Sequence, residues 1–335
     1  MGYNGHMVNW KMVGHEWAVA LLTHQITIGN LRHAYLITGP QGVGRRTLAL
    51  RLAQAINCPQ APAPGEACQV CQTCRRIERM QHPDLAVVQA EQVGATLKVD
   101  QIRELQHSLA LAPYEARYRV ALLLRFEEAH PSAANALLKT LEEPAPQVVL
   151  ILTAESPERL LPTIVSRCEV LRLRPVPFEV VAEGLRSERE LEPQQAYLLA
   201  HLSNGRPGYA FYLSEDIEAQ TRRQAWLADH QRLLGASLIE RFAYARHLAA
   251  GNDSIRELLQ VWLSLWRDVL LQAVKSSAPL TNLDQLAVIE RLSTRLPPQT
   301  VHQVIASLSQ TLSLLDLNVN ARLAVEVLML NLPEL

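Results

Sequence analysis

A glycine-rich segment at residues 39–47 has the frame of a phosphate-binding loop but lacks its chemical groups. It follows an apolar run and fits the pattern G-x-x-x-x-G-K-[ST]. In a working loop the lysine reaches the β- and γ-phosphates and the hydroxyl coordinates Mg²⁺. In this chain arginines stand at both positions. Since a guanidinium cannot ligate a cation, we expect neither Mg-nucleotide hydrolysis nor ATP binding by this chain. The candidate residues of the loop are Gly39, Gly42, Gly44, Arg45, Arg46 and Thr47.

Two other interpretations of this loop stay open from the sequence. Arg45 and Arg46 could still hold an anion at the start of the following helix, where backbone N–H groups converge. The segment could also be a glycine-rich turn of an unrelated α/β protein. We favour a loop that is kept as a structural turn rather than as a catalytic element.

The carboxylates that would hold Mg²⁺ are displaced as well. A hydrolytic P-loop enzyme usually places an Asp after an apolar strand to bind the ion. Here the apolar run at residues 120–124 is followed by Arg125, and Glu127 and Glu128 come three residues late. That offset moves a side chain by roughly 10 Å along a strand. We therefore predict a solvated pair of charges rather than a metal site.

Four cysteines have the spacing of a metal site. Cys58, Cys68, Cys71 and Cys74 form C-x9-C-x2-C-x2-C, and four thiolates close a tetrahedral Zn²⁺ site. Such a site leaves no coordination position for catalysis, so we predict a structural zinc ion that orders a loop. Free cysteines and redox catalysis are the weaker alternatives, because a fourth thiol nearby favours a metal.

Arginines at two places in the sequence could contact phosphates. Arg167, within Ser166-Arg167-Cys168, could act on a neighbour's γ-phosphate as an arginine finger, although the tripeptide alone equally fits a surface salt bridge. Cys168 by itself is typical of a small buried residue. A second group lies beside the cysteines, where a solvated face is the default and phosphate contact the alternative: Arg75, Arg76 and Arg79.

Composition limits the class of protein. The chain has 335 residues, of which 48% are hydrophobic and 19% charged, so it can bury sizeable cores. Its net charge of −1 excludes a strong uniform field toward nucleic acid, though not a local basic patch. No apolar run approaches the roughly 20 residues that span a bilayer, and no secretory leader is recognisable. We expect a cytoplasmic protein with no membrane partner, and we leave residues 1–7 out of fold reasoning.

Hydrophobic patterning predicts two different halves. In the first, buried strands alternate with helices, which indicates a doubly wound α/β domain with the glycine loop at a strand's carboxyl end. A Pro-Val-Pro hinge at residues 175–177 then leads to three short helices and an all-helical remainder. The predicted domains are 8–174, 175–214 and 215–335. The predicted strands are 34–38, 84–88, 120–124 and 148–153, and the helices are 17–28, 46–56, 99–109, 132–141 with Ser132 as N-cap, 178–187, 193–203 and 207–214.

These residues together resemble a known family. The most specific block is SAANALLKTLEEP at residues 132–144, followed by PTIVSRC at 162–168. Supporting matches are RHAYL at 32–36, VDQIREL at 99–105, NVNARL at 318–323 and the cysteine cluster. The chain is similar to the clamp-loader subunits of bacterial DNA polymerase III, a branch of the AAA+ superfamily, and within it to the delta-prime family.

The resemblance implies more than the spacing arguments do. The fold would be a RecA-like AAA+ domain with a zinc knuckle over 58–74, a three-helix lid and a helical collar for oligomerisation. The chain would be a rigid stator in a heteropentamer with gamma/tau motors and delta, loading the sliding clamp onto primer-template DNA in the nucleoid-associated replisome. It would be no enzyme by itself but a component of the DNA-directed DNA polymerase holoenzyme. Arg167 would be an arginine finger in trans.

Differences from the motor subunits of this family indicate which clamp-loader subunit this chain resembles. Motor subunits keep the loop lysine and an Asp-Glu pair after the strand, whereas this chain has Arg45, Arg46, Leu124 and Arg125 there. Gly208 stands where a nucleotide-sensing arginine would align, with an arginine two residues before it. A delta subunit would lack both the SRC motif and the cysteines. The alternatives are a divergent gamma/tau-like ATPase and a zinc-dependent nucleic-acid binder, for which the near-neutral charge supplies no strong basic surface.

Overall fold

The computed structural model describes residues 10–92, 94–250, 255–317 and 319–335 of the chain. Residues 1–7, which we left out of fold reasoning, and Asn318 of the NVNARL match lie outside this range. The chain forms two compact units. The first unit comprises the chain up to Gly184 together with Gly205–Tyr209, and the second comprises Leu185–Asn204 and Ala210–Leu335.

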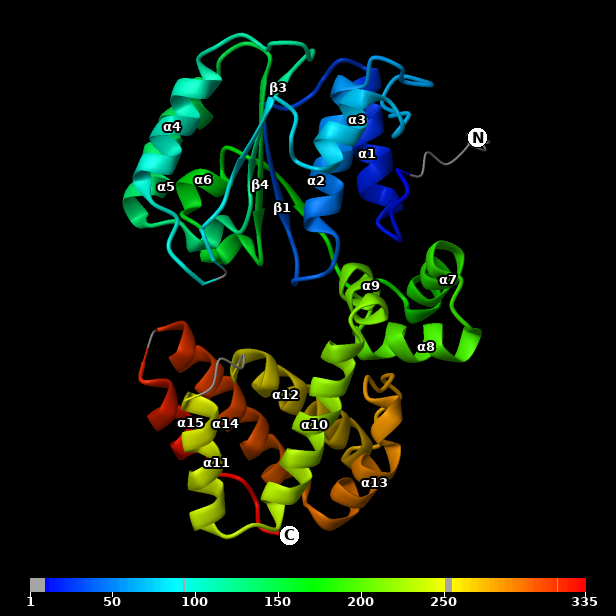
Figure 1. The fold of residues 1–335 in the computed structure, drawn as a ribbon, viewed down its shortest axis with the longest axis vertical. Coiled ribbons are helices and arrows are strands. Elements are labelled where there is room, and N and C mark those ends of the chain that lie inside the picture. Colours follow the sequence, from blue (N-terminus) through cyan, green and yellow to red (C-terminus); the bar gives the residue numbers. More distant parts are fainter. Residues whose placement is uncertain (1–9, 93, 251–254, 318) are drawn as a thin grey trace. The chain divides into compact units, whose positions relative to one another are not determined.

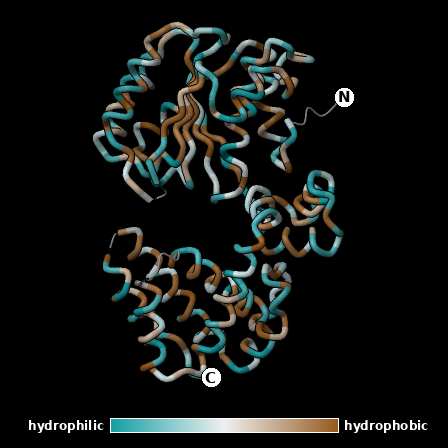
Figure 2. The backbone as a smooth tube through the Cα atoms, viewed as in Figure 1, coloured by the Kyte–Doolittle hydropathy of each residue, from teal (hydrophilic) through white to brown (hydrophobic). Residues whose placement is uncertain are grey.

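The first unit is built on a five-stranded parallel sheet (Figure 1). Its strand order is β2-β3-β4-β1-β5. Figure 2 shows hydrophobic residues along the strands, as expected for parallel strands that helices cover on both faces. All five residues of β1 and all seven of β4 are buried. The strands are β1 Ala34–Thr38, β2 Leu85–Val88, β3 Arg119–Leu123, β4 Val148–Ala154 and β5 Glu169–Arg172.

Helices cover the two faces of this sheet in separate groups (Figure 1). One group and its face of the sheet share a first hydrophobic core, and the other group shares a second core. The first group is α1 Glu16–Thr27, α2 Arg45–Asn57 and α3 Gln72–Glu78, and the second is α4 Val99–Leu109, α5 Pro131–Glu142 and α6 Pro162–Val165. Short 3-10 turns are η1 Phe126–Glu128 and η2 Pro157–Arg159. The predicted α/β domain with a parallel sheet between two layers of helices is confirmed.

Two local predictions differ from the structure. Strand β5, which was not predicted, pairs with β1 at the edge of the sheet, where only one of its four residues is buried. A strand of four residues that is only partly buried has no strong hydrophobic signature. Helix α5 begins at Pro131, and its cap is His130, whose Nδ1 accepts a hydrogen bond from the N–H of Ser132. Ser132 therefore lies inside the first turn, because proline occupies the first helical position.

The second unit is entirely helical in its described residues, which confirms the predicted helical second half. Its core contains Trp262 and Trp266, both fully buried, as their four-residue spacing suggests. Among the described helices, none combines the length and the apolarity that a bilayer crossing requires. The helices from the hinge onward are α7 Phe178–Arg189, α8 Pro193–Leu202, α9 Pro207–Glu215, α10 Ile217–Leu234, α11 Leu238–Ala250, α12 Ile255–Ala273, η3 Leu283–Gln285, α13 Leu286–Arg295, α14 Pro298–Asp316 and α15 Ala321–Leu330.

Candidate functional site

The glycine loop leaves the carboxyl end of β1 and turns into α2, as the frame predicts. The N–H of Gly39 donates to the carbonyls of Ala154 and Glu155 at 3.3 and 3.1 Å, which ties the loop to the end of β4. Gly39 has φ 148°, and a Cβ there would lie 2.4 Å from the carbonyl oxygen of Leu173. Gly44 caps α2 with φ 113°. Both positions therefore require glycine for the backbone path, whether or not a phosphate binds.

Residues Gly205–Tyr209, which follow α8 and belong to the first unit, pack directly on this loop. The N–H of Tyr209 donates to the carbonyl of Gly42 at 3.2 Å. The guanidinium of Arg206 lies 4.5 Å from the centre of the Tyr209 ring, and its Nη1 donates to the carbonyl of Gln41 at 3.4 Å. A Cβ at Gly208 would lie 2.9 Å from the carbonyl oxygen of Gly42. Gly208, which stands where a nucleotide-sensing arginine would align, thus approaches the loop through its backbone alone.

Arg45, at the lysine position, is neutralised within the chain. Its Nη1 lies 3.9 Å from Oε1 of Glu127, and each of these side chains is only 10% exposed. Burial lowers the pKa of Arg45, and Glu127 opposes that shift. Burial also raises the pKa of Glu127, and the Arg45 guanidinium opposes it. The charge that would meet a γ-phosphate is therefore paired with the chain's own carboxylate, while Arg46 is exposed.

The prediction of a solvated acidic pair is wrong. The side chains of Glu127 and Glu128 are 10% and 13% exposed, and both are paired. Arg125 has a left-handed backbone with φ 49°, which turns the chain into η1. Its Nε then donates to both carboxylate oxygens of Glu128, at 3.1 and 3.0 Å, and Oε1 of Glu127 accepts from the N–H of Glu155 at 3.2 Å. Both carboxylates therefore have partners within the chain.

The four cysteines come together as their spacing predicts. Their sulfur atoms all lie within 4.8 Å of one another. A tetrahedral zinc with Zn–S bonds of about 2.3 Å requires sulfurs about 3.8 Å apart. The sulfurs of Cys58 and Cys68 are 3.5 Å apart, and those of Cys58 and Cys71 are 4.0 Å apart. The cluster can therefore hold a metal ion, and its all-thiolate donor set fits zinc.

Local structure positions these sulfurs. Cys58 ends α2, Cys71 caps α3, and Cys74 lies in the first turn of α3. The Sγ of Cys71 accepts from the N–H of Cys74 at 3.4 Å, and the Sγ of Cys68 accepts from the N–H of Cys71 at 3.3 Å. Burial acts against a thiolate at Cys68, but N–H donors from Val70 and Cys71 prevail and lower its pKa to about 6. Backbone N–H groups thus stabilise the anionic form that a metal needs.

The SRC motif follows α6 and contacts the last residue of α5, the helix that carries most of the block at residues 132–144. The Nη2 of Arg167 donates to Oε1 of Glu142 at 2.6 Å, and its Nη1 donates to the carbonyl of Thr163 at 2.8 Å. The side chain of Arg167 is 34% exposed and that of Glu142 is 51% exposed. Cys168 packs against the second core, and burial raises the pKa of its thiol to about 12. Within this motif Ser166 is exposed and Arg167 is partly exposed, whereas Cys168 packs against the core.

Comparisons with known proteins identify the family. The family described as DNA polymerase III, delta subunit, matches residues 14–177, and the one described as DNA polymerase III, delta subunit, C terminal, matches residues 237–334. The subunit delta' of DNA polymerase III from Bacillus subtilis is 30% identical over 98% of this chain and 99% of its own length. The chain belongs to the delta-prime subunit family of DNA polymerase III. The resemblance seen in the sequence is confirmed.

Other relatives include both delta-prime and motor subunits. The delta' subunit from Pseudomonas aeruginosa is 39% identical over 58% of this chain and 59% of its own length. The tau subunit from Escherichia coli is 33% identical over 58% of this chain and 30% of its own length. A delta-prime subunit therefore shares a region with the tau subunit, so residues at individual positions must distinguish the two.

Three residues of this delta-prime site were missed by sequence reasoning. Glu127 was taken for a solvated charge, Tyr209 was not considered, and Glu142 was noted only as part of the block at residues 132–144. Burial and partner choice of a side chain depend on how distant segments pack, so no local pattern marks Glu127 or Tyr209. Glu142 did have a sequence signal, since it lies in the block that accompanies the SRC motif.

Proposed function

We propose that this chain is the non-hydrolysing stator of a clamp loader and lends Arg167 to a neighbouring ATPase. In this proposal it assembles with gamma/tau motors and delta into a heteropentamer that loads the sliding clamp onto primer-template DNA. Its own loop binds no ATP, and its cysteine cluster holds structural zinc. Membership of the delta-prime family of DNA polymerase III is the basis of the proposal.

The pairing of Arg45 with Glu127 supports the proposal that this chain does not hydrolyse ATP. A motor loop needs an unpaired lysine facing the phosphates and a carboxylate facing Mg²⁺. Here a guanidinium and a carboxylate are buried against each other, 3.9 Å apart. A nucleotide would have to compete with Glu127 for this guanidinium and would meet the negative charge of a buried carboxylate. The carbonyl of Gly42, in addition, is engaged by the N–H of Tyr209.

The exposure of Arg167 supports the finger role. Arginine fingers stabilise charge on a phosphoryl group held by another subunit, so the guanidinium must reach the protein surface. Arg167 is one-third exposed, and its carboxylate partner Glu142 is half exposed. Such a pair is worth about 1 kcal/mol or less, so a neighbour's triphosphate can displace the carboxylate.

The experiment that tests this function is the ATPase activity of the reconstituted complex. Arg167→Ala should leave the folding and assembly of the complex intact and reduce DNA-stimulated ATP hydrolysis. A finger contributes about 10³–10⁵ at its own site, and the whole-complex effect is smaller because other sites retain fingers. Arg172→Ala, another exposed arginine of the same unit, is the matched control. Unchanged ATP hydrolysis in an assembled complex with Arg167→Ala would refute the finger role.

A divergent gamma/tau-like ATPase is the second candidate, because the chain is 33% identical to the tau subunit over 58% of its length. It would have to use Arg45 in place of lysine, although the fork-shaped guanidinium does not reproduce a point ammonium charge. ATP binding and hydrolysis by the isolated chain distinguish the candidates. Turnover that is lost in Arg45→Ala would favour the motor, whereas no bound nucleotide would favour the stator.

A further inference from the structure

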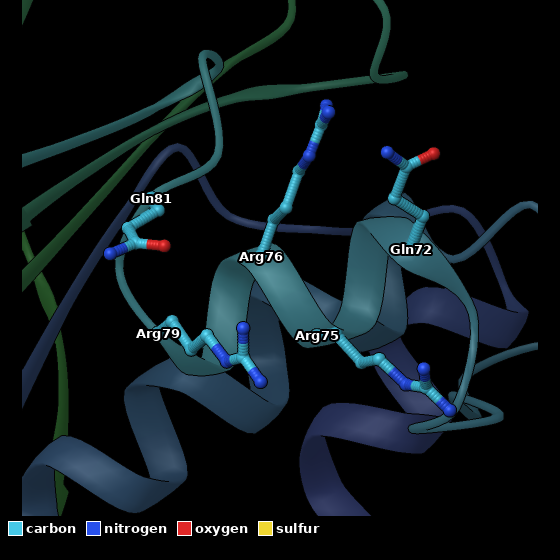
Figure 3. A pocket seen from close by; sticks show the side chains of 5 residues that line it. All are labelled: Gln72, Arg75, Arg76, Arg79 and Gln81. Atoms are coloured by element: carbon cyan, nitrogen blue, oxygen red, sulfur yellow. The ribbon is translucent and has the colours of Figure 1, made fainter.

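Helix α3 carries a hollow that the proposed function does not use. The hollow has a volume of about 350 Å³, and it is lined by Gln72, Arg75, Arg76, Arg79 and Gln81. Figure 3 shows Arg75 and Arg79 extending along one side of α3, while Arg76 and Gln72 extend from the other. Every lining side chain ends in a guanidinium or an amide group. The hollow therefore offers hydrogen-bond donors and positive charge at the ends of its lining side chains, although most of the surface that lines it is apolar.

The charge in this hollow is only partly compensated. Arg76 pairs with Glu115 at 3.0 Å, and Glu78 of the same helix pairs with Arg51. Within the described chain, Arg75 and Arg79 have no ion-pair partner, and both are exposed. Residues four apart on a helix are neighbours, so these two guanidinium groups concentrate positive charge on one side of α3. A molecule of net charge −1 thus carries a local cationic site.

The helix that presents these arginines is held in place on both sides. Cys71 caps α3 and Cys74 lies within it, so a metal ion bound by the cysteine cluster would fix its first turn. The Nε2 of Gln54 on α2 donates to the carbonyl of Cys74 at 2.8 Å and to Oε2 of Glu78 at 2.9 Å. A fixed backbone lowers the entropy cost when a ligand binds the side chains.

We propose that this arginine hollow binds the phosphate backbone of DNA. Arginine recognises phosphate through parallel N–H donors, and glutamine amides also donate to phosphate oxygens. An acidic protein segment is the less suitable occupant, because protein interfaces centre on buried apolar or aromatic side chains and this hollow has none. The contacts would be independent of base sequence, since guanidinium and amide groups that bind phosphate oxygens do not read the bases.

The test measures binding of fluorescein-labelled DNA, single-stranded and duplex, to the full zinc-loaded chain by fluorescence anisotropy. The variant is Arg75→Ala with Arg79→Ala. Its matched control is Arg103→Ala with Arg172→Ala, which removes the same charge from exposed arginines on α4 and β5. Zinc content and the thermal unfolding midpoint establish that each variant is folded.

We expect the α3 variant to bind about tenfold more weakly and the control to bind as the wild type does. The slope of log K against log salt, over about 50–200 mM, should become shallower by about 1.4 for single strands and 1.8 for duplex, as two phosphate contacts are lost. Equal weakening in both variants would reduce the effect to net charge and overturn the proposal. Wild-type chain that binds inorganic phosphate but neither form of DNA would overturn it as well.

Discussion

Arg167 and Glu142 join two segments that the sequence keeps apart. The Nη2 of Arg167 donates to Oε1 of Glu142 at 2.6 Å, linking the SRC motif to the end of the block at residues 132–144. Both side chains stay partly exposed. The proposed finger is thus held by a weak ion pair near the surface rather than buried.

Glu142→Ala tests whether the ion pair that holds Arg167 is needed for ATP hydrolysis by the neighbouring subunit. The variant keeps the guanidinium, and an exposed ion pair contributes only about 0.2–1 kcal/mol, so ATP hydrolysis by the reconstituted complex should change by no more than about fivefold. Arg167→Ala should cost considerably more in the same assay. If the two variants lowered hydrolysis equally, Glu142 would be essential for positioning the finger and the pair would not be a readily displaced contact.

Removing one partner of the buried pair in the degenerate loop should destabilise the first unit. Glu127→Ala leaves the Arg45 guanidinium buried without its carboxylate, and we expect a loss of about 3 kcal/mol of unfolding free energy in urea. The double change Arg45→Met with Glu127→Leu should recover most of it. Arg103→Ala, which breaks an exposed pair, is the control and should change stability by less than about 1 kcal/mol. A mild effect of Glu127→Ala would show that the pair is solvated.

The cysteine cluster predicts a specific pattern of metal loss. Cys74→Ser should remove bound zinc, measured by elemental analysis, and lower the thermal unfolding midpoint by several degrees, because thiolate–zinc bonds contribute directly to folding. Cys168→Ser is the matched control, since this thiol lies outside the cluster and should leave the zinc content unchanged. Wild-type chain purified without zinc, and unable to take it up, would contradict the metal site.

Acid should destabilise the helical second unit through one histidine. His230 is fully buried, its Nε2 accepts a hydrogen bond from Nε1 of Trp266, and burial, assisted by Arg241, lowers its pKa to about 3. The unfolded chain, with a pKa near 6.5, binds the proton more readily, so stability falls as the pH drops from about 6.5 toward 3.

The measurement compares wild type with His230→Gln, which keeps an acceptor for Trp266. Between about pH 6.5 and 5 the wild type should lose about 2 kcal/mol more than the variant, at 1.4 kcal/mol per pH unit. The difference between the two proteins removes the contribution of His15 and His82, whose pKa values burial also lowers. Parallel pH profiles would mean that His230 is accessible to protons in the folded state.

Features set by neighbours in the chain were predictable from the sequence alone. Cysteine spacing, the glycine frame and the alternation of strands and helices depend on local geometry, and all three are present in the structure. Strand β5 and the cap of α5 were not predicted correctly, since a short edge strand has a weak pattern and a proline moved the helix start by one residue.

Tertiary structure decided what the charged residues do. The sequence shows that Arg45 replaces a lysine, but only packing pairs it with Glu127 and buries both. It shows the SRC motif, but only packing sets Arg167 against Glu142 with a third of its side chain exposed. A charge behaves according to its solvent exposure and its nearest counter-charge, and both depend on segments that meet only in the folded chain.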